Sequence, residues 1–221
     1  MIPFDIHPAD CPAFDYSTHP DCRRLLPRRV GQLLIALRTR RFDTLDAAAD
    51  TRGVHRELFW ALTPHGHPYF AGHYRGEDFR CLRNYRVQVG PPIDTRVGCP
   101  PLLVLGAMGR VEDTIRSAIA ALDAAHQLPN SVVLPGPKLL HTVQVACRIF
   151  EWVNRIHPYA NGNGHAARFC VWAILGRYGY WPVRWPLDPR PPDPPYTSLL
   201  LEYRAGNPER LEQYILQCLV N

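Results

Sequence analysis

Ten consecutive residues constrain the fold of this chain more than any other feature. Residues 166–175 read Ala-Ala-Arg-Phe-Cys-Val-Trp-Ala-Ile-Leu, and Arg168 carries their only charge. A helix that is apolar on nearly every side is stable only when other elements surround it. We therefore expect residues 166–175 to form the central buried helix of the domain.

Apolar residues at helical spacing predict the helices that surround this segment. The expected helices cover residues 25–49, 54–62, 103–125, 135–153, 196–205 and 208–219. Residues 1–22 are rich in Pro, Asp and aromatic side chains without periodicity, so we expect an irregular arm that lies on the domain. Because no repeat and no second domain is recognised, we predict one all-α domain over residues 23–221.

The segment 64–100 differs from the helical remainder of the chain. Pro, Gly, His and aromatic residues dominate it. Within it, Tyr85-Arg86-Val87-Gln88-Val89 alternates apolar and polar side chains with the period of a strand, and Gly90-Pro91-Pro92 stops the pattern. We therefore predict a small β-hairpin that stands off the helical body.

Charge and hydropathy exclude several classes of function. The 25 Lys and Arg residues and 20 Asp and Glu residues give a net charge of +5 without a run of five basic residues, so we expect no nucleic-acid partner. No apolar stretch has the length of a membrane span. The N-terminus lacks a basic stretch followed by an apolar run, so we expect no secretory signal and a cytoplasmic location.

The seven cysteines include no pair at the Cys-x-x-Cys spacing of a zinc knuckle or a redox site. Cys147 and Cys170 fall within apolar helical patterns, where a buried reduced thiol is expected. We predict that none of the seven is catalytic. The chain also lacks His-Glu-x-x-His, which disfavours a zinc hydrolase.

One polar segment between two expected helices is suited to binding phosphate. It reads His157-Pro158-Tyr159-Ala160-Asn161-Gly162-Asn163-Gly164-His165-Ala166-Ala167-Arg168. Gly162 and Gly164 permit backbone conformations that direct successive N–H groups toward one point, and the following helix adds the positive end of its dipole. The segment therefore predicts a nest for the phosphates of a nucleotide.

The same segment supplies a base and a cation. His157 ends the preceding helix, where it could take a proton from an incoming hydroxyl while the nest holds the phosphate. Arg168 lies on the first turn of the next helix and could bind further phosphate oxygens with two N–H groups. Phosphoryl-type transfer needs little else, because positioning and charge neutralisation supply most of the catalysis.

These residues resemble the signature of the Fic domain, in the Fido superfamily, which is written H-x-F-x-(D/E)-G-N-G-R-x-x-R. Tyr159 stands conservatively for Phe, and the chain matches at His157, Gly162, Asn163, Gly164 and Arg168. Residues 54–59 and 71–75 resemble the family's helix and the approach to its flap, and residues 196–216 resemble its closing helices. The resemblance spans roughly residues 50–220 and implies a Fic-type helical bundle with a small β-hairpin flap.

The resemblance also implies an activity and a role for each matched residue. Most characterised Fic proteins transfer AMP from ATP to a Ser, Thr or Tyr hydroxyl of a target protein, and others transfer different phosphate-containing groups. His157 would then be the general base, and Gly162, Asn163, Gly164 and Arg168 would bind phosphates. The strand at residues 85–89 would align the target protein by strand addition. Tyr196 and Arg204 fall where the family places nucleobase contacts.

Two positions depart from the signature. Asn161 replaces the carboxylate that would hold Mg²⁺, so metal binding is expected to be weaker or to depend on the nucleotide. His165 replaces the first arginine, and a neutral imidazole stabilises phosphate less than a guanidinium. Three alternatives stay open: an enzyme with an altered donor or metal requirement, a slow enzyme, and a nucleotide- or protein-binding module without catalysis. A phosphotransferase is a further possibility.

Many Fic proteins carry a self-inhibiting helix with the pattern (S/T)-x-x-x-E-(G/N). The nearest match, at residues 198–203, lacks the last residue and lies within an expected core helix, so we interpret it as a false match. Inhibition would then come from a separate inhibitor protein or from the N-terminal arm.

Overall fold

The computed structural model describes residues 10–89 and 94–219. These residues form eight α-helices and two short 3-10 turns, and they contain no β-strand, which agrees with the predicted all-α class. The helices are α1 (Cys22–Arg38), α2 (Thr44–Ala49), α3 (Arg52–Phe59), α4 (Pro101–Gln127), α5 (Pro135–Ile156), α6 (Asn163–Arg177), α7 (Tyr196–Arg204) and α8 (Glu209–Gln217).

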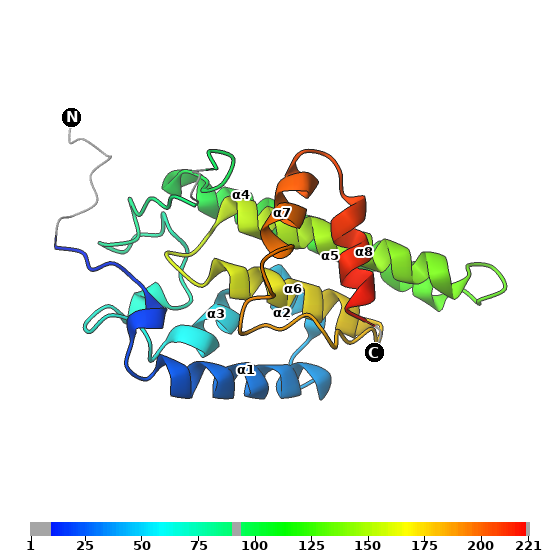
Figure 1. Cartoon of the computed structure of the whole chain (residues 1–221), viewed down its shortest axis with the longest axis horizontal. Coiled ribbons are helices and arrows are strands. Elements are labelled where there is room, and N and C mark those ends of the chain that lie inside the picture. Colours follow the sequence, from blue (N-terminus) through cyan, green and yellow to red (C-terminus); the bar gives the residue numbers. More distant parts are fainter. Residues whose placement is uncertain (1–9, 90–93, 220–221) are drawn as a thin grey trace.

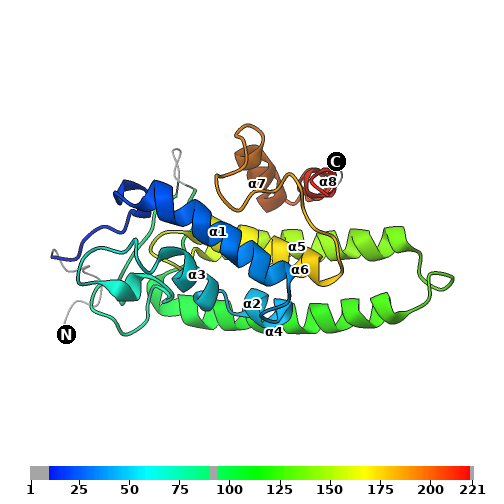
Figure 2. The same cartoon turned by 90° about the horizontal axis from the view of Figure 1, so that it is seen from below.

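The prediction of a central buried helix is confirmed by α6. All residues from His165 to Gly176 are buried, including the charged Arg168. Figure 1 shows α6 between α1 and the antiparallel pair of α4 and α5, and α7 and α8 pack against α5. Figure 2 shows that α4 and α5 run side by side as a long hairpin. Among the described residues, none of the helices combines the length and the apolar character of a membrane span.

The expected helix over residues 25–49 is two helices. It is interrupted after α1, because Arg40 adopts a left-handed conformation with φ 54°. Asp43 then starts α2, since its carboxylate accepts hydrogen bonds from the N–H groups of Leu45 and Asp46. The apolar residues keep their helical spacing across this break, so the spacing alone predicted one continuous helix.

The predicted β-hairpin flap is not found among the described residues, and Gly90-Pro91-Pro92 lies outside them. Tyr85–Val89 has no regular secondary structure, although its side chains alternate between half-buried and exposed as the period-2 pattern predicted. The returning chain bonds to it at Asp94, whose N–H donates to the Val89 carbonyl at 2.9 Å. Further along, Gly98 and Cys99 instead donate their N–H groups to the carbonyls of Arg155 and Ile156 at the end of α5. The single bond at Val89 therefore does not continue into a ladder along residues 85–89.

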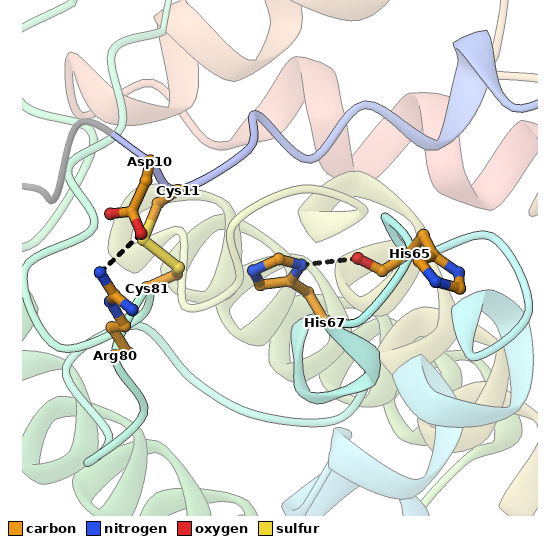
Figure 3. Close-up of a disulfide and its surroundings, with 6 residues drawn as sticks. All are labelled: Asp10, Cys11, His65, His67, Arg80 and Cys81. Carbon is orange, nitrogen blue, oxygen red and sulfur yellow. Dashed lines mark hydrogen bonds and ion pairs between the residues drawn. A yellow bond between two sulfur atoms is a disulfide. The ribbon is translucent and has the colours of Figure 1, made fainter.

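The described part of the N-terminal arm, residues 10–21, is fixed to the domain. Its Phe14 side chain is buried against Phe59 and Phe70, with ring centroids 6.3 and 5.5 Å away. A disulfide joins Cys11 to Cys81 in the segment between α3 and α4 (Figure 3). The cysteine spacing had given no sign of this bond, which links residues 70 positions apart.

Candidate functional site

The segment between α5 and α6 is a closed loop whose shape depends on Asn163. Its side-chain oxygen accepts a hydrogen bond from the Tyr159 N–H at 2.7 Å, and its side-chain nitrogen donates to the Tyr159 carbonyl at 2.9 Å. Gly162 turns the chain into α6 with φ 76°. A Cβ at Gly162 would lie 2.5 Å from the Phe59 ring and 2.9 Å from His55, so glycine is required there.

The N-terminus of α6 offers the predicted anion site. Among the described residues, the N–H groups of Asn163 and Gly164 donate to no acceptor, because they precede the first hydrogen bonds of the helix. The helix dipole of this 15-residue helix adds partial positive charge at the same end. The Gly162 N–H is used within the loop, since it donates to the Asn161 side-chain oxygen at 2.7 Å.

His157 is held in the form that a general base needs. It ends α5 in a left-handed conformation with φ 54°, and its Nδ1 lies 2.7 Å from the Asn154 carbonyl oxygen. Because a carbonyl only accepts, Nδ1 carries the proton and Nε2 carries the lone pair. Nε2 has no hydrogen-bond partner in the described part of the chain. Burial lowers the pKa of His157 to about 4, so the imidazole is neutral near pH 7.

Arg75 supports His157 from behind. Its buried guanidinium donates to the carbonyls of His157 at 2.7 Å and Ile156 at 3.1 Å, and also to those of Tyr85 and Cys99. The backbone N–H of Arg75 donates to the Pro158 carbonyl. One side chain therefore satisfies the last carbonyls of α5 and ties the segment between α3 and α4 to them.

His55 supports the other side of the loop. Its ring is stacked on Tyr159 at 3.7 Å, and its Nε2 lies 2.9 Å from the Asn161 carbonyl oxygen. Nδ1 accepts the Gly72 N–H, so Nε2 carries the proton and donates to Asn161. Burial lowers the pKa of His55 to about 3, which keeps this pattern unchanged at neutral pH.

The two candidate phosphate side chains on α6 already have protein partners. Arg168 donates through Nε and Nη2 to the Leu187 carbonyl, at 3.1 and 2.7 Å. His165 Nε2 lies 3.2 Å from Asp188 Oδ1. Burial lowers the pKa of His165 even though Asp188 opposes the change, so at neutral pH the contact is a hydrogen bond from a neutral ring rather than an ion pair.

Asn161 does not fit the role of a metal ligand. Its side-chain oxygen accepts the Gly162 N–H, and its side-chain nitrogen donates to the Phe14 carbonyl in the arm at 2.9 Å. Both ends of the amide are therefore engaged by the protein. No group of three or more His, Cys, Asp or Glu side chains among the described residues is arranged to hold a metal ion.

The structure brings the predicted phosphate-site residues together in one pocket of about 200 Å³. Seven of its lining residues come from the signature loop and the start of α6: His157, Asn161, Gly162, Asn163, Gly164, His165 and Arg168. Sequence reasoning missed the other three, which no pattern marks: Tyr16 begins a 3-10 turn, and Asp188 and Arg190 lie in an irregular segment. Larger hollows exist elsewhere, including one of about 750 Å³ beside α1, α2 and α3, but it contains none of the signature residues.

Tyr196 and Arg204 lie outside this pocket. Tyr196 is buried among aromatic side chains, with Arg190 stacked over its ring at 5.0 Å. Arg204 forms ion pairs with Glu151 and Asp94, both at 3.2 Å. Both nevertheless lie near pocket residues, since the charge of Arg168 acts on Tyr196 and that of Arg204 acts on His157. Their contacts with a nucleobase stay a prediction.

No protein-family model matches the chain, and no curated protein is significantly similar to it.

Proposed function

We propose that this chain is a Fic-type protein modifier that transfers AMP, or another phosphate-containing group, from a nucleotide to a hydroxyl side chain of a target protein. One observation supports the proposal above the others. Three kinds of group line the same pocket. They are a neutral histidine whose Nε2 has no hydrogen-bond partner among the described residues, two N–H groups at a helix N-terminus that donate to no acceptor there, and a buried arginine. A base beside an anion nest is the minimum that such a transfer needs.

The proposed transfer requires only ATP and the hydroxyl of the target protein. His157 Nε2 takes the proton of the target hydroxyl, whose oxygen forms a bond to the α-phosphorus of ATP. The bond between that phosphorus and the bridging oxygen of pyrophosphate breaks, and pyrophosphate leaves. The N–H groups of Asn163 and Gly164, with Arg168, would neutralise the charge on the phosphates.

Mg²⁺, which the family resemblance implies, is assigned no step in this proposal. The amide oxygen of Asn161 is neutral and already accepts the Gly162 N–H, and the amide nitrogen donates to the Phe14 carbonyl, so the side chain is a poorer metal ligand than a carboxylate. In the proposed mechanism, the N–H groups of Asn163 and Gly164 and the guanidinium of Arg168 therefore neutralise the charge on the phosphates. Magnesium carried in by the nucleotide would be held mainly by the phosphates.

The second candidate is a nucleotide-binding module without efficient catalysis. The loss of the metal-binding carboxylate at Asn161 favours it, since an amide holds Mg²⁺ less well. A pKa of about 4 for His157 also favours it, because a base works best with a pKa near the working pH. Bound anionic phosphates would raise this pKa, which reduces the second objection.

Labelled nucleotide distinguishes these functions. The protein is incubated with ATP labelled at the α-phosphate, Mg²⁺ and a cell extract, and transfer of label to a protein is measured. Transfer that is lost in His157→Ala supports AMP transfer. Transfer from γ-labelled ATP alone indicates a phosphotransferase, and nucleotide binding without transfer indicates the binding module. The assay is repeated with other nucleoside triphosphates to test for a different donor.

A further inference from the structure

Residues 11–21 of the arm form a strap that is fastened at both ends. At one end, the disulfide joins Cys11 to Cys81, and the neighbouring Asp10 and Arg80 form an ion pair at 2.5 Å (Figure 3). At the other end, the strap continues directly into α1 at Cys22. The segment between these anchors is therefore confined to one path over the domain.

The middle of the strap enters the candidate phosphate pocket. Tyr16 is one of the lining residues, and its ring packs 4.7 Å from Phe59 and edge-on to His165 at 5.5 Å. The charges of Arg168 and Asp188 both act on the Tyr16 hydroxyl, so this hydroxyl lies near the arginine that is predicted to bind phosphate. Burial raises its pKa to about 12, so the hydroxyl is neutral at physiological pH.

The strap also engages the signature loop through its backbone. The Phe14 carbonyl accepts a hydrogen bond from the Asn161 side chain at 2.9 Å. Asn161 is the position at which the Fic signature has a carboxylate, and a carboxylate has no proton to donate to a carbonyl. Asparagine is therefore the residue that allows the strap to dock on this loop.

We propose that the strap is a redox-controlled plug of the phosphate pocket. With the Cys11–Cys81 disulfide intact, Tyr16 and the Phe14 carbonyl stay in place and the pocket is restricted to about 200 Å³. Reduction releases one anchor, the strap detaches more often, and the pocket opens to nucleotide. The effect on nucleotide binding rests on the proposed function, whereas release of the strap does not.

The reductant is a dithiol, and the exchange is balanced. Cys81 is 1% exposed and Cys11 is half-buried, so the Cys11 sulfur is the accessible one. A thiolate of the reductant attacks Cys11 Sγ, and Cys81 leaves as a thiolate that takes a proton. The second thiol of the reductant then releases Cys11 and closes the reductant's own disulfide. Two electrons and two protons pass to the chain.

Loss of one anchor should weaken the plug without abolishing it. Phe14 is buried by aromatic contacts that do not involve the disulfide, and α1 still holds the other end. Docking changes from a doubly tethered to a singly tethered segment, which lowers the effective concentration of Tyr16 at the pocket. We expect the open fraction, and with it the affinity for ATP, to rise about tenfold on reduction.

The test compares oxidised and dithiothreitol-reduced full-length protein. Hydrogen exchange is measured on peptides that cover residues 11–21, and ATP binding is measured by calorimetry. Cys11→Ser/Cys81→Ser should behave as the reduced protein under both conditions. Cys99→Ser, which removes a free thiol in the same segment as Cys81, should respond to reduction as the unaltered chain does. Tyr16→Ala should raise ATP affinity in the oxidised protein and leave the disulfide intact.

Each result decides the proposal. Faster exchange at residues 11–21 on reduction supports the plug, and equal exchange in the two oxidation states overturns it, whatever happens to ATP. Faster exchange with ATP binding in neither state leaves the plug supported and contradicts the proposed nucleotide function instead. Tighter ATP binding on reduction without a change in exchange would contradict the strap as its cause.

Discussion

Arg75→Ala should destabilise the whole domain and disable the site. Its guanidinium is 1% exposed and donates to four backbone carbonyls, at distances of 2.7, 2.9, 3.0 and 3.1 Å. Burial lowers the pKa of Arg75 to about 10, which still leaves it charged at neutral pH. Truncation leaves these carbonyls without their donor in the interior.

The size of the effect follows from the hydrogen bonds. Each bond to a charged donor contributes about 1.5–3 kcal/mol, and the four are not additive because burying the guanidinium is itself costly. We therefore expect the free energy of unfolding to fall by about 3–5 kcal/mol, out of a usual total of about 5–15. For a chain of this length, the melting temperature should drop by about 10 °C.

Urea denaturation followed by circular dichroism measures this loss. Arg83→Ala is the matched control, because Arg83 lies in the same segment, is exposed and pairs only with the exposed Asp78 among the described residues. The control should change the stability by less than about 0.5 kcal/mol. Arg75→Lys should lie between the two, since an ammonium has three donors for four carbonyls. A loss below about 1 kcal/mol in Arg75→Ala would refute the view that this side chain holds the end of α5 in place.

Three further results are expected. Gly162→Ala should lose about 2–4 kcal/mol of unfolding free energy from backbone strain and the clash with Phe59, whereas Gly179→Ala, with φ 82° and open space, should lose only about 1, and equal losses would remove the steric argument. An NMR titration should give His157 a pKa of about 4, and a higher pKa when ATP is bound. Because this pKa is about 6.5 in the unfolded chain, the free energy of unfolding should rise with pH between 4 and 6.5, and His157→Gln should flatten this rise. Asn161→Asp should speed hydrogen exchange of residues 11–21, since a carboxylate would face the Phe14 carbonyl; unchanged exchange would argue against that contact.

The helical architecture could be predicted because it depends on a simple physical pattern. The apolar sequence of α6 requires burial, and the amphipathic stripes around it require a neighbour on one side each. The break between α1 and α2 could not be seen in the same way. It depends on a left-handed Arg40 and on the capping of Asp43, both of which are local and leave the apolar period intact.

The predicted hairpin is wrong because strand pairing depends on contacts with residues far away in the sequence. Alternation at residues 85–89 correctly indicated which side chains are half-buried, but a strand also needs a partner with free donors. In the candidate partner, the N–H groups of Gly98 and Cys99 instead donate to carbonyls at the end of α5. A period-2 pattern therefore predicted exposure and could not predict pairing.

The candidate site divides along similar lines. The signature loop was found because glycines, a histidine and an arginine lie close together in sequence, and the structure keeps them together. Tyr16 and Arg75 reach the site from segments far away in the chain. The resemblance at residues 71–75 included Arg75 without giving it a role, and no pattern marked Tyr16. Tyr196 and Arg204 were assigned by analogy alone. An aromatic cluster and two ion pairs hold their side chains, and their contacts with a nucleobase stay a prediction.

The disulfide connects the site to the redox state of its surroundings. A reducing compartment keeps most protein thiols reduced, whereas an oxidising one preserves a bond such as Cys11–Cys81. If the strap is a plug, the same chain has an open pocket in the first environment and a restricted one in the second. In a reducing compartment, the open form would be the resting state and oxidation the signal that closes it. Asn161 fits this arrangement, because its side-chain amide donates a hydrogen bond to the Phe14 carbonyl of the strap.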